Sequence, residues 1–265
     1  MPDVSVPDEL VLTTDVGRVR VVTLHRPSAA NSFNGTLCAA LADALERAAN
    51  DDAVSVAVVT GAGSVFTGGI DLHQMTDRSD HDATETGLAA FSDFLTALST
   101  FPKPILAAVN GAAVGIGVTM LFHVDLVLVS DRARLRMPFT AMGVVPEAAS
   151  TLRLPALVGR QRAAELMFTA EWIDAPRAVA LGIARSVHQH DELLDDAIAL
   201  GARIAEQPLP SLMATKRLLL APEADAIVAT VARENAAFSE LLALPDADAR
   251  VLAQLDKSQR DVPRA

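Results

Sequence analysis

The chain has 265 residues, 51% of them hydrophobic, which is enough to bury one large core or one core with a small appendage. Asp and Glu number 33 against 22 Lys and Arg, and the formal net charge of -11 opposes binding to nucleic acid or to an acidic membrane surface. No apolar run reaches the roughly 18 residues of a membrane-spanning helix, so we expect no membrane span.

The first part of the chain alternates strands with helices. Residues 18–24 (RVRVVTL) have strand character, and residues 37–49 have helical composition and spacing. Residues 54–60 (VSVAVVT) form a nearly continuous apolar run, typical of a strand buried on both faces. A second cycle predicts helices at about 85–99 and near 115–122, and strands at 104–110 and 125–130. This alternation indicates an α/β fold.

After about residue 190 the strand patterns stop. Four segments have the composition of helices, separated by QPLP, APEA and LPDA: 191–206, 209–220, 223–243 and 246–256. We therefore predict a core over residues 1–190 and a helical region over 191–265. The helical region is a candidate both for contacts between subunits and for covering the mouth of the core.

Cysteine and histidine usage narrows the chemistry. The one cysteine, Cys38, cannot form an intramolecular disulfide. The first residues, MPDVSVPDEL, are acidic where a signal peptide is basic and then apolar, so we expect a cytoplasmic protein. The six histidines have no metal-ligand spacing, and we predict no metal site.

Two glycine-rich segments follow predicted strands, GAGSVFTGGIDL (61–72) and NGAAVGIG (110–117). Neither contains the GxxxxGK[ST] phosphate loop or the three-glycine dinucleotide pattern. Gly68 and Gly69 would let the backbone approach a ligand closely, and the N–H groups after Gly115 would point at an anion. Two converging N–H groups make an oxyanion hole, whereas the simpler interpretation is that these glycines only permit turns.

A carboxylate, Glu147, stands in the apolar and small-residue segment MGVVPEAASTLRLPALVG (142–159). A proline followed by an acid and good helix formers is typical of a first helical turn, which is the simpler interpretation of Pro146 and Glu147. The alternative is proton chemistry by a carboxylate whose pKa is raised in apolar surroundings.

These segments carry a resemblance to a known family. RPSAANSF, GAGSVFTGGIDL, NGAAVGIGVTM and DLVLVSDRARLRMP resemble motifs of the crotonase, or enoyl-CoA hydratase/isomerase, superfamily. The resemblance runs from about residue 10 into the helical tail. It implies a spiral of ββα units, a C-terminal helical trimerisation region, and homotrimers or dimers of trimers. It also implies a coenzyme A thioester as the substrate, with no permanently bound cofactor.

The resemblance assigns roles to individual residues. It places the oxyanion donors at the N–H groups of Gly68 and Ile116, although the family commonly has glycine at the second position. The two glutamates of the family's hydratases correspond here to Thr119 and Phe139, neither of which can act as a base. VPEAAST is similar to the segment of peroxisomal-type Δ3,Δ2-enoyl-CoA isomerases in which the glutamate is the only catalytic base, and Glu147 matches it.

Further residues are predicted around the substrate. The resemblance implies that the coenzyme A thioester contacts residues of the first two motifs and the second glycine-rich segment: Arg26, Ala30, Phe66, Ile70, Asp71, Leu72 and Gly117. Asp71 is also expected to cap a helix. Lys103 is a candidate partner for phosphates and His73 a candidate for the pocket mouth, with solvated surface side chains as the alternative. Trp172 is expected to pack between helices.

Isomerisation is the function that these residues favour, because one carboxylate can move a proton from C2 to C4 of an enolate. A covalent role for Glu147, as in 4-chlorobenzoyl-CoA dehalogenases, is less favoured because those enzymes use aspartate. Members of the family that use a tyrosine are disfavoured because the chain has none. A hydratase-like reaction and a non-catalytic acyl-CoA binder stay open, while the charge of -11 opposes RNA binding.

Overall fold

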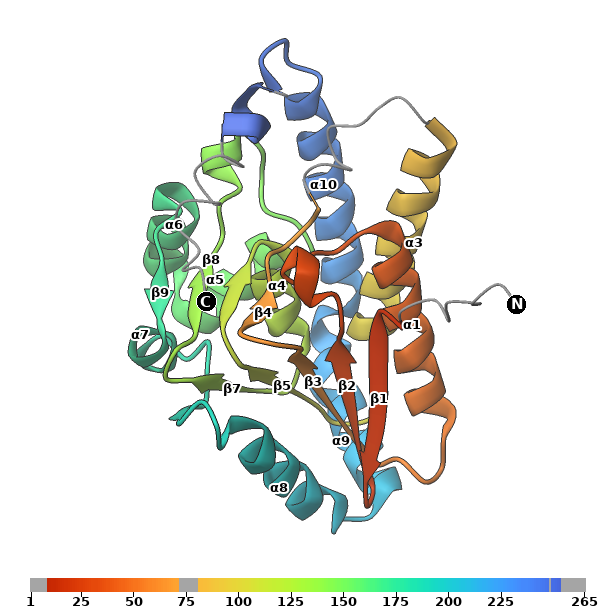
Figure 1. The fold of residues 1–265 in the computed structure, drawn as a ribbon. Helices are drawn as coiled ribbons and strands as arrows, with labels where there is room; N and C mark the ends of the chain where they lie inside the picture. Colours follow the sequence, from red (N-terminus) through yellow and green to blue (C-terminus); the bar gives the residue numbers. More distant parts are fainter. Residues whose placement is uncertain (1–8, 72–80, 248, 254–265) are drawn as a thin grey trace, which may run out of the picture.

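A computed structural model describes residues 9–71, 81–247 and 249–253. Its larger sheet has the strand order β1-β2-β3-β5-β7-β10 (Figure 1). The strands of this sheet are β1 (Val11–Val16), β2 (Val19–Leu24), β3 (Val56–Gly61), β5 (Ile105–Val109), β7 (Leu126–Ser130) and β10 (Ser186–His188). Only the β1–β2 pair within it is antiparallel.

A second sheet of short strands lies beside the first, in the order β4-β6-β8-β9. Its strands are β4 (Val65–Thr67), β6 (Ala112–Val114), β8 (Arg134–Arg136) and β9 (Ile173–Asp174). The pairs β3–β4, β5–β6 and β7–β8 each give one strand to each sheet, and a helix follows each pair. The chain thus advances as a spiral of ββα units, which confirms the fold expected from the sequence.

The helices surround these sheets, and the described part of the chain after residue 190 is helical, as expected (Figure 1). The α-helices are α1 (Gly35–Asn50), α3 (His81–Ser99), α4 (Ile116–Thr119), α5 (Ser150–Val158), α6 (Arg160–Thr169), α7 (Ala175–Ala180), α8 (Leu193–Ala205), α9 (Leu209–Leu220) and α10 (Ala224–Leu242). The 3-10 helices are η1 (Pro27–Ala29), η2 (Met120–His123), η3 (Thr140–Met142) and η4 (Ala221–Glu223). The helix expected near 115–122 is therefore a short α-helix continued by a 3-10 turn, and residues 247 and 249–253 are helical.

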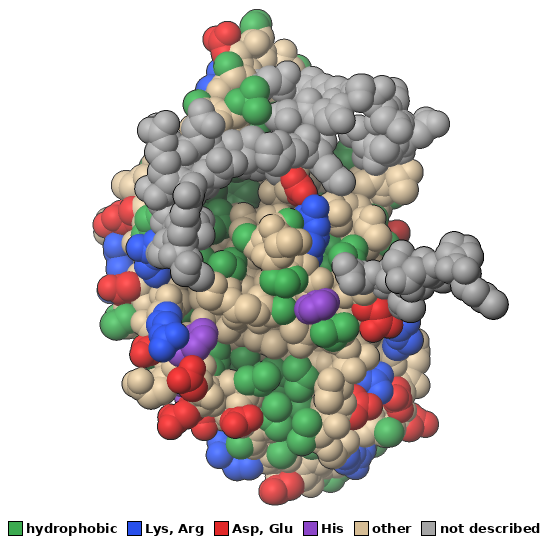
Figure 2. Space-filling model, in the orientation of Figure 1, with side chains coloured by type: hydrophobic (Ala, Val, Ile, Leu, Met, Phe, Trp, Pro, Cys, Tyr) green, Lys and Arg blue, Asp and Glu red, His purple; other side chains and the backbone are tan. Residues whose placement is uncertain are grey.

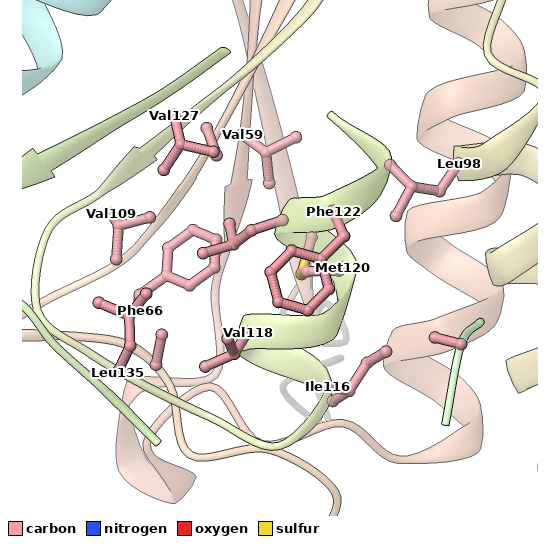
Figure 3. Close-up of a cluster of buried hydrophobic side chains, with 14 of the residues drawn as sticks. Val59, Phe66, Leu98, Val109, Ile116, Val118, Met120, Phe122, Val127 and Leu135 are labelled. Atoms are coloured by element: carbon pink, nitrogen blue, oxygen red, sulfur yellow. The ribbon is translucent and has the colours of Figure 1, made fainter. Parts of the chain in front are cut away.

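The continuous apolar run of β3 is explained by burial on both of its faces. Val59 lies in the main core, which Figure 3 shows around Phe66. Val56 and Val58 point to the opposite face, where α8 covers them. This helix approaches closely at Gly201, where a Cβ atom would lie only 3.2 Å from methyl groups of Val19.

Helices α1 and α3 pack side by side and form one flank of the molecule. Asn34 caps α1, since its side chain accepts a hydrogen bond from the Leu37 N–H at 2.8 Å. The rings of Phe33 and Phe94 lie 5.3 Å apart between these helices. The two helices are in close backbone contact at Gly35, where a Cβ atom would lie 3.1 Å from the Cα atom of Gly87. This arrangement fixes one wall of the pocket described below.

Surface features bear on the partners expected from the sequence. Every helix within the described ranges is too short or too polar to cross a bilayer. Acidic and basic side chains are interspersed around the margin of the face drawn in Figure 2, with hydrophobic side chains toward its centre. On the C-terminal helices, Leu218, Leu219 and Val228 are each at least 70% exposed. The trimer or hexamer expected from the sequence stays a prediction.

Candidate active site

A pocket of about 630 Å³ lies between the core and the C-terminal helices. Its walls come from α1, α3, α10 and the segment around Glu147. Most of the lining side chains on α3 and α10 are apolar, among them Leu88, Phe91, Leu95, Ile227, Val231 and Phe238. The pocket therefore suits a largely apolar ligand bearing a few polar groups.

Glu147 is the most perturbed acid on the pocket wall. The residue is partly buried, and its Oε1 atom is itself buried with no hydrogen-bond partner among the described residues. Burial raises the pKa of Glu147 to about 8, and the negative charge of Glu234 acts in the same direction. A carboxyl group that binds its proton this tightly, with a free oxygen at a pocket, is suited to exchange protons with a ligand.

The other titratable groups near Glu147 give it no positive partner. Nε2 of His123 donates to the Ala148 carbonyl at 2.7 Å, and burial lowers the pKa of this histidine to about 4, so it is neutral at pH 7. Burial, with the charge of Glu147, raises the pKa of the Cys38 thiol to about 12, so it is protonated. The charge on Glu147 is therefore balanced by neither group.

The backbone after Glu147 overturns the first-turn interpretation. Helix α5 begins at Ser150, and the two residues between have left-handed backbone, with φ of 58° at Ala148 and 54° at Ala149. Left-handed backbone costs about 1–2 kcal/mol per non-glycine residue, so a contact elsewhere must hold it. Glu147 thus lies outside the helix, in a turn that aims its side chain into the pocket.

Glu234 of α10 supplies that contact. Oε2 accepts from the Ala149 N–H at 2.7 Å, while Oε1 accepts from the Thr151 N–H at 2.9 Å and from the Thr151 hydroxyl at 2.6 Å. Burial raises the pKa of Glu234, and these three donors oppose the rise. The sequence reasoning missed this residue, because nothing near position 234 in the sequence indicates that its partners lie about 85 residues away.

The two glycine-rich segments meet, as the oxyanion hypothesis requires. The prediction that the Gly68 N–H is one of the oxyanion donors is wrong. The Gly68 N–H donates to the Ala30 carbonyl at 2.8 Å and is not free for a ligand. Two residues on, Ile70 lines the pocket, and no acceptor among the described residues faces its N–H. The bridge between Phe33 and Ile70 explains why the Ile70 N–H is left over. The backbone of Phe33 donates to the Gly69 carbonyl and accepts from the Asp71 N–H, on either side of Ile70.

Ile116 opens α4, where the N–H groups of a first turn have no partner within the helix. The two segments touch at Gly69, which has φ of 92° and where a Cβ atom would lie 2.8 Å from the Val114 carbonyl oxygen. Only glycine allows this approach, which places the Ile70 segment against the start of α4. The Ile116 side chain is buried in the core (Figure 3), so its bulk is accommodated away from the backbone N–H.

The residues expected to contact coenzyme A lie in different surroundings. Ile70 and Asp71 line the pocket. Phe66 and Gly117 do not: both are buried, and a Cβ atom at Gly117 would lie 2.4 Å from a Thr67 methyl group. These two predictions are wrong because the residues pack the core that supports the site. Leu72 lies outside the described residues.

The two remaining predicted contacts lie in the loop before α1. Nη1 of Arg26 donates to the Asp71 carboxylate at 2.9 Å and to the Ser32 carbonyl at 3.0 Å, so this arginine ties the loop to the pocket wall. Ala30 is partly exposed and has left-handed backbone with φ of 52°. Neither is among the residues that line the pocket. Their contact with a coenzyme stays a prediction.

Other sequence candidates have structural roles. Lys103 is buried, and its ammonium group donates to the carbonyls of Ala48 and Asp51 at the end of α1, so it is no phosphate partner. Trp172 is partly exposed and lies within 4.8 Å and 5.4 Å of two arginine guanidinium groups, where packing between helices had been expected. His73, and the helix that Asp71 was expected to cap, lie outside the described residues.

Asn31 explains why the RPSAANSF segment is built as it is. Its amide group is fully buried and donates to the carbonyls of Ala62, Val65 and Phe66, while its oxygen accepts from the Arg26 N–H. One side chain thereby satisfies four backbone groups and joins the first loop to the glycine-rich segment. Among the described residues, no cluster of three or more His, Cys, Asp and Glu is arranged to hold a metal ion.

Comparison with known proteins identifies the family. The model of the enoyl-CoA hydratase/isomerase family matches residues 15–259. The chain belongs to the enoyl-CoA hydratase/isomerase family. It is 33% identical to 2,3-dehydroadipyl-CoA hydratase of Escherichia coli (strain K12), covering 92% of this chain and 94% of the relative. It is also 33% identical to enoyl-CoA delta isomerase 2 of Rattus norvegicus, covering 79% of this chain and 54% of the relative.

Solved structures support the same assignment. The crystal structure of enoyl-CoA hydratase/isomerase from Pseudoalteromonas atlantica T6c has a TM-score of 0.86 and 36% identity, covering 94% of this chain and 97% of that one. The structure of Pseudomonas aeruginosa OdaA has a TM-score of 0.85 and 33% identity, covering 92% and 98%. The fold of this enoyl-CoA hydratase/isomerase family member is therefore the crotonase fold, and coenzyme A thioesters are the family's substrates.

At the two positions that resemble the glutamates of hydratases, this family member has groups that move no proton. Thr119 is fully buried in α4, and Oγ1 has no hydrogen-bond partner among the described residues. Phe139 is 3% exposed and belongs to the main core. Among the described residues, the titratable groups on the pocket wall are Cys38, Asp71, His123, Glu147 and Glu234.

Proposed function

We propose that this protein catalyses the isomerisation of Δ3-enoyl-CoA to Δ2-enoyl-CoA, with Glu147 as the single proton shuttle. The observation that carries the proposal is the position of Glu147, partly buried at the pocket wall with one buried carboxyl oxygen that has no hydrogen-bond partner among the described residues. Isomerisation requires one base to remove a proton from C2 and the resulting acid to return it to C4. A second acid is not needed.

The raised pKa of Glu147 suits this exchange. With a pKa of about 8, roughly a tenth of the carboxyl groups are ionised at neutral pH, and each ionised group is a stronger base than an exposed glutamate. Burial also removes water that would compete to protonate the dienolate. The rate should therefore rise with pH as Glu147 loses its proton.

The thioester oxygen of the dienolate needs donors that are already in place. The N–H groups of Ile70 and Ile116 are suited to this task, because the segments that carry them are in contact at Gly69 and neither N–H has a protein acceptor among the described residues. Ile70 thus takes the role that the sequence had assigned to Gly68. Each such donor typically contributes about 3 kcal/mol of transition-state stabilisation.

The other carboxylates on the pocket wall argue against hydration. Glu234 accepts three hydrogen bonds from the turn and start of α5, and Asp71 forms an ion pair with Arg26. A hydratase must activate water and deliver a proton, which calls for two acid–base groups close to the double bond. Glu147 is the pocket carboxyl group with a free oxygen, so a reaction that needs one shuttle is favoured.

The test follows conversion of trans-3-enoyl-CoA to trans-2-enoyl-CoA by the absorbance of the conjugated thioester, with hydration of 2-enoyl-CoA assayed in parallel. Glu147→Gln keeps the size of the side chain and removes the base, and Glu240→Gln at an exposed position of α10 is the matched control. We expect the first variant to lose about 10²-fold or more in kcat and the control to retain its rate. Absence of isomerisation in the unmodified protein, or full activity of Glu147→Gln, would refute the proposal and leave an acyl-CoA binder or another thioester reaction.

A further inference from the structure

Glu234 holds both the start of α5 and the turn that precedes it. This helix lacks the usual side-chain cap, because Ala149 occupies the cap position and offers only backbone. The carboxylate of Glu234 reaches the Ala149 and Thr151 N–H groups from another helix and so replaces the missing cap. Those N–H groups belong to the turn that aims Glu147 into the pocket.

The same carboxylate lies close enough to Glu147 for their charges to interact, and both side chains line the pocket. Other described titratable groups on the wall come from different elements: Cys38 from α1, His123 from η2 and Asp71 from the loop after β4. The thiol is protonated and the imidazole neutral at pH 7, while Asp71 is paired with Arg26. Arg233, next to Glu234 on α10, carries a positive charge that acts on Glu234, and Glu234 is the charged group that acts on Glu147.

We infer that Glu234 is a positioning residue for Glu147: its carboxylate holds the left-handed turn at Ala148 and Ala149 and places a negative charge beside the Glu147 carboxyl group at the pocket wall. This inference rests on the proposed function, since it assigns Glu147 the proton transfer. Glu234 itself donates no proton in this scheme, because both of its oxygens already accept hydrogen bonds from the protein.

Two properties should change together when the charge of Glu234 is removed. The apparent pKa of Glu147 should fall, because one of the two causes that raise it is gone. The limiting rate, measured above this pKa where Glu147 is ionised in both proteins, should fall as well, because an amide cannot accept all three hydrogen bonds and the turn loosens. A residue that acts only as a cap would change the rate without moving the titration of Glu147.

The experiment compares Glu234→Gln with Glu240→Gln, which removes an exposed carboxylate from the same helix. Protonated Glu147 is followed as the infrared band of a buried carboxylic acid, identified by its loss in Glu147→Gln, and the band is titrated against pH. The readout needs no turnover, so it remains informative even if the isomerase proposal fails. We expect the midpoint to fall by about one pH unit or more in Glu234→Gln and to stay fixed in Glu240→Gln.

Kinetics supply the second half of the test. For Glu234→Gln we expect kcat measured above the midpoint to fall about tenfold with KM within about twofold, and the pH–rate midpoint to move with the infrared midpoint. Thr151→Val removes one of the three donors and keeps the charge of Glu234. It should lower kcat with little change in the midpoint, and it tests the turn even if Glu234→Gln does not fold. An unchanged infrared midpoint in a folded Glu234→Gln variant would overturn the inference.

Discussion

Replacing Glu147 by glutamine should change how the stability of the protein depends on pH. In the folded protein the pKa of this carboxyl group is about 8, against an ordinary value of 4.5. Between these two values the folded chain holds a proton that the unfolded chain has released. The contribution of Glu147 to stability is therefore fully present below pH 4.5 and is lost as the pH rises toward 8. Glutamine does not titrate, so the variant lacks this loss.

The size of the effect follows from linkage. Each pH unit inside the window corresponds to about 1.36 kcal/mol of unfolding free energy, and the whole window corresponds to about 5 kcal/mol. Between about pH 5.5 and about pH 7.5, the stability of Glu147→Gln relative to the unmodified protein should increase by about 3 kcal/mol. The direction is unusual for an acid, since an ion-paired carboxylate would lose stability as the pH falls.

Urea unfolding followed by fluorescence measures this, because the chain has a single tryptophan, Trp172. The unmodified protein, Glu147→Gln and the exposed control Glu240→Gln are compared at the two pH values. Equal changes in unfolding free energy for all three proteins would show that Glu147 titrates near its ordinary pKa. That result would remove the physical basis for its role as a base tuned by burial.

Three further predictions concern the residues that support the site. Gly69→Ala should lower the free energy of unfolding by at least about 2 kcal/mol more than Gly182→Ala and abolish isomerisation, because both have positive φ but only Gly69 is crowded by backbone. Lys216→Met should lower the free energy of unfolding by about 3 kcal/mol with little dependence on salt, since it leaves the partly buried carboxylate of Asp125 without its ion-pair partner. Asn31→Asp should lower the free energy of unfolding by about 3 kcal/mol or more, because a carboxylate cannot donate to the three carbonyls that Asn31 joins. Removing the helix cap by Asn34→Ala should lower it by only about 1 kcal/mol. Urea unfolding measures each cost, and equal costs within the glycine pair or within the asparagine pair would contradict the stated cause. For Lys216→Met, a cost that disappears at high salt would contradict it.

Strong local patterns predicted the elements of the core well. The strands expected at 54–60, 104–110 and 125–130 agree with β3, β5 and β7 to within two residues at each end, because continuous apolar runs are buried on both faces. The short strands of the second sheet were not predicted. Strands of two or three residues, such as β4 and β9, are too short to show a periodic pattern.

For the site, the sequence by itself determined the ingredients. It singled out Glu147 as a carboxylate in an apolar segment, two glycine-rich turns after buried strands, and the absence of a base at positions 119 and 139. These are properties of residue type and local spacing, which a single sequence contains.

The tertiary structure decided which atoms are available for chemistry. It moved the free N–H group from Gly68 to Ile70, because hydrogen-bond partners are assigned by the pairing of segments distant in sequence. It buried Glu147 and brought Glu234 to the turn beside it from about 85 residues away. Desolvation and the interaction of two charges depend on distance in space, so the pKa that suits Glu147 to proton transfer is a property of the folded chain alone.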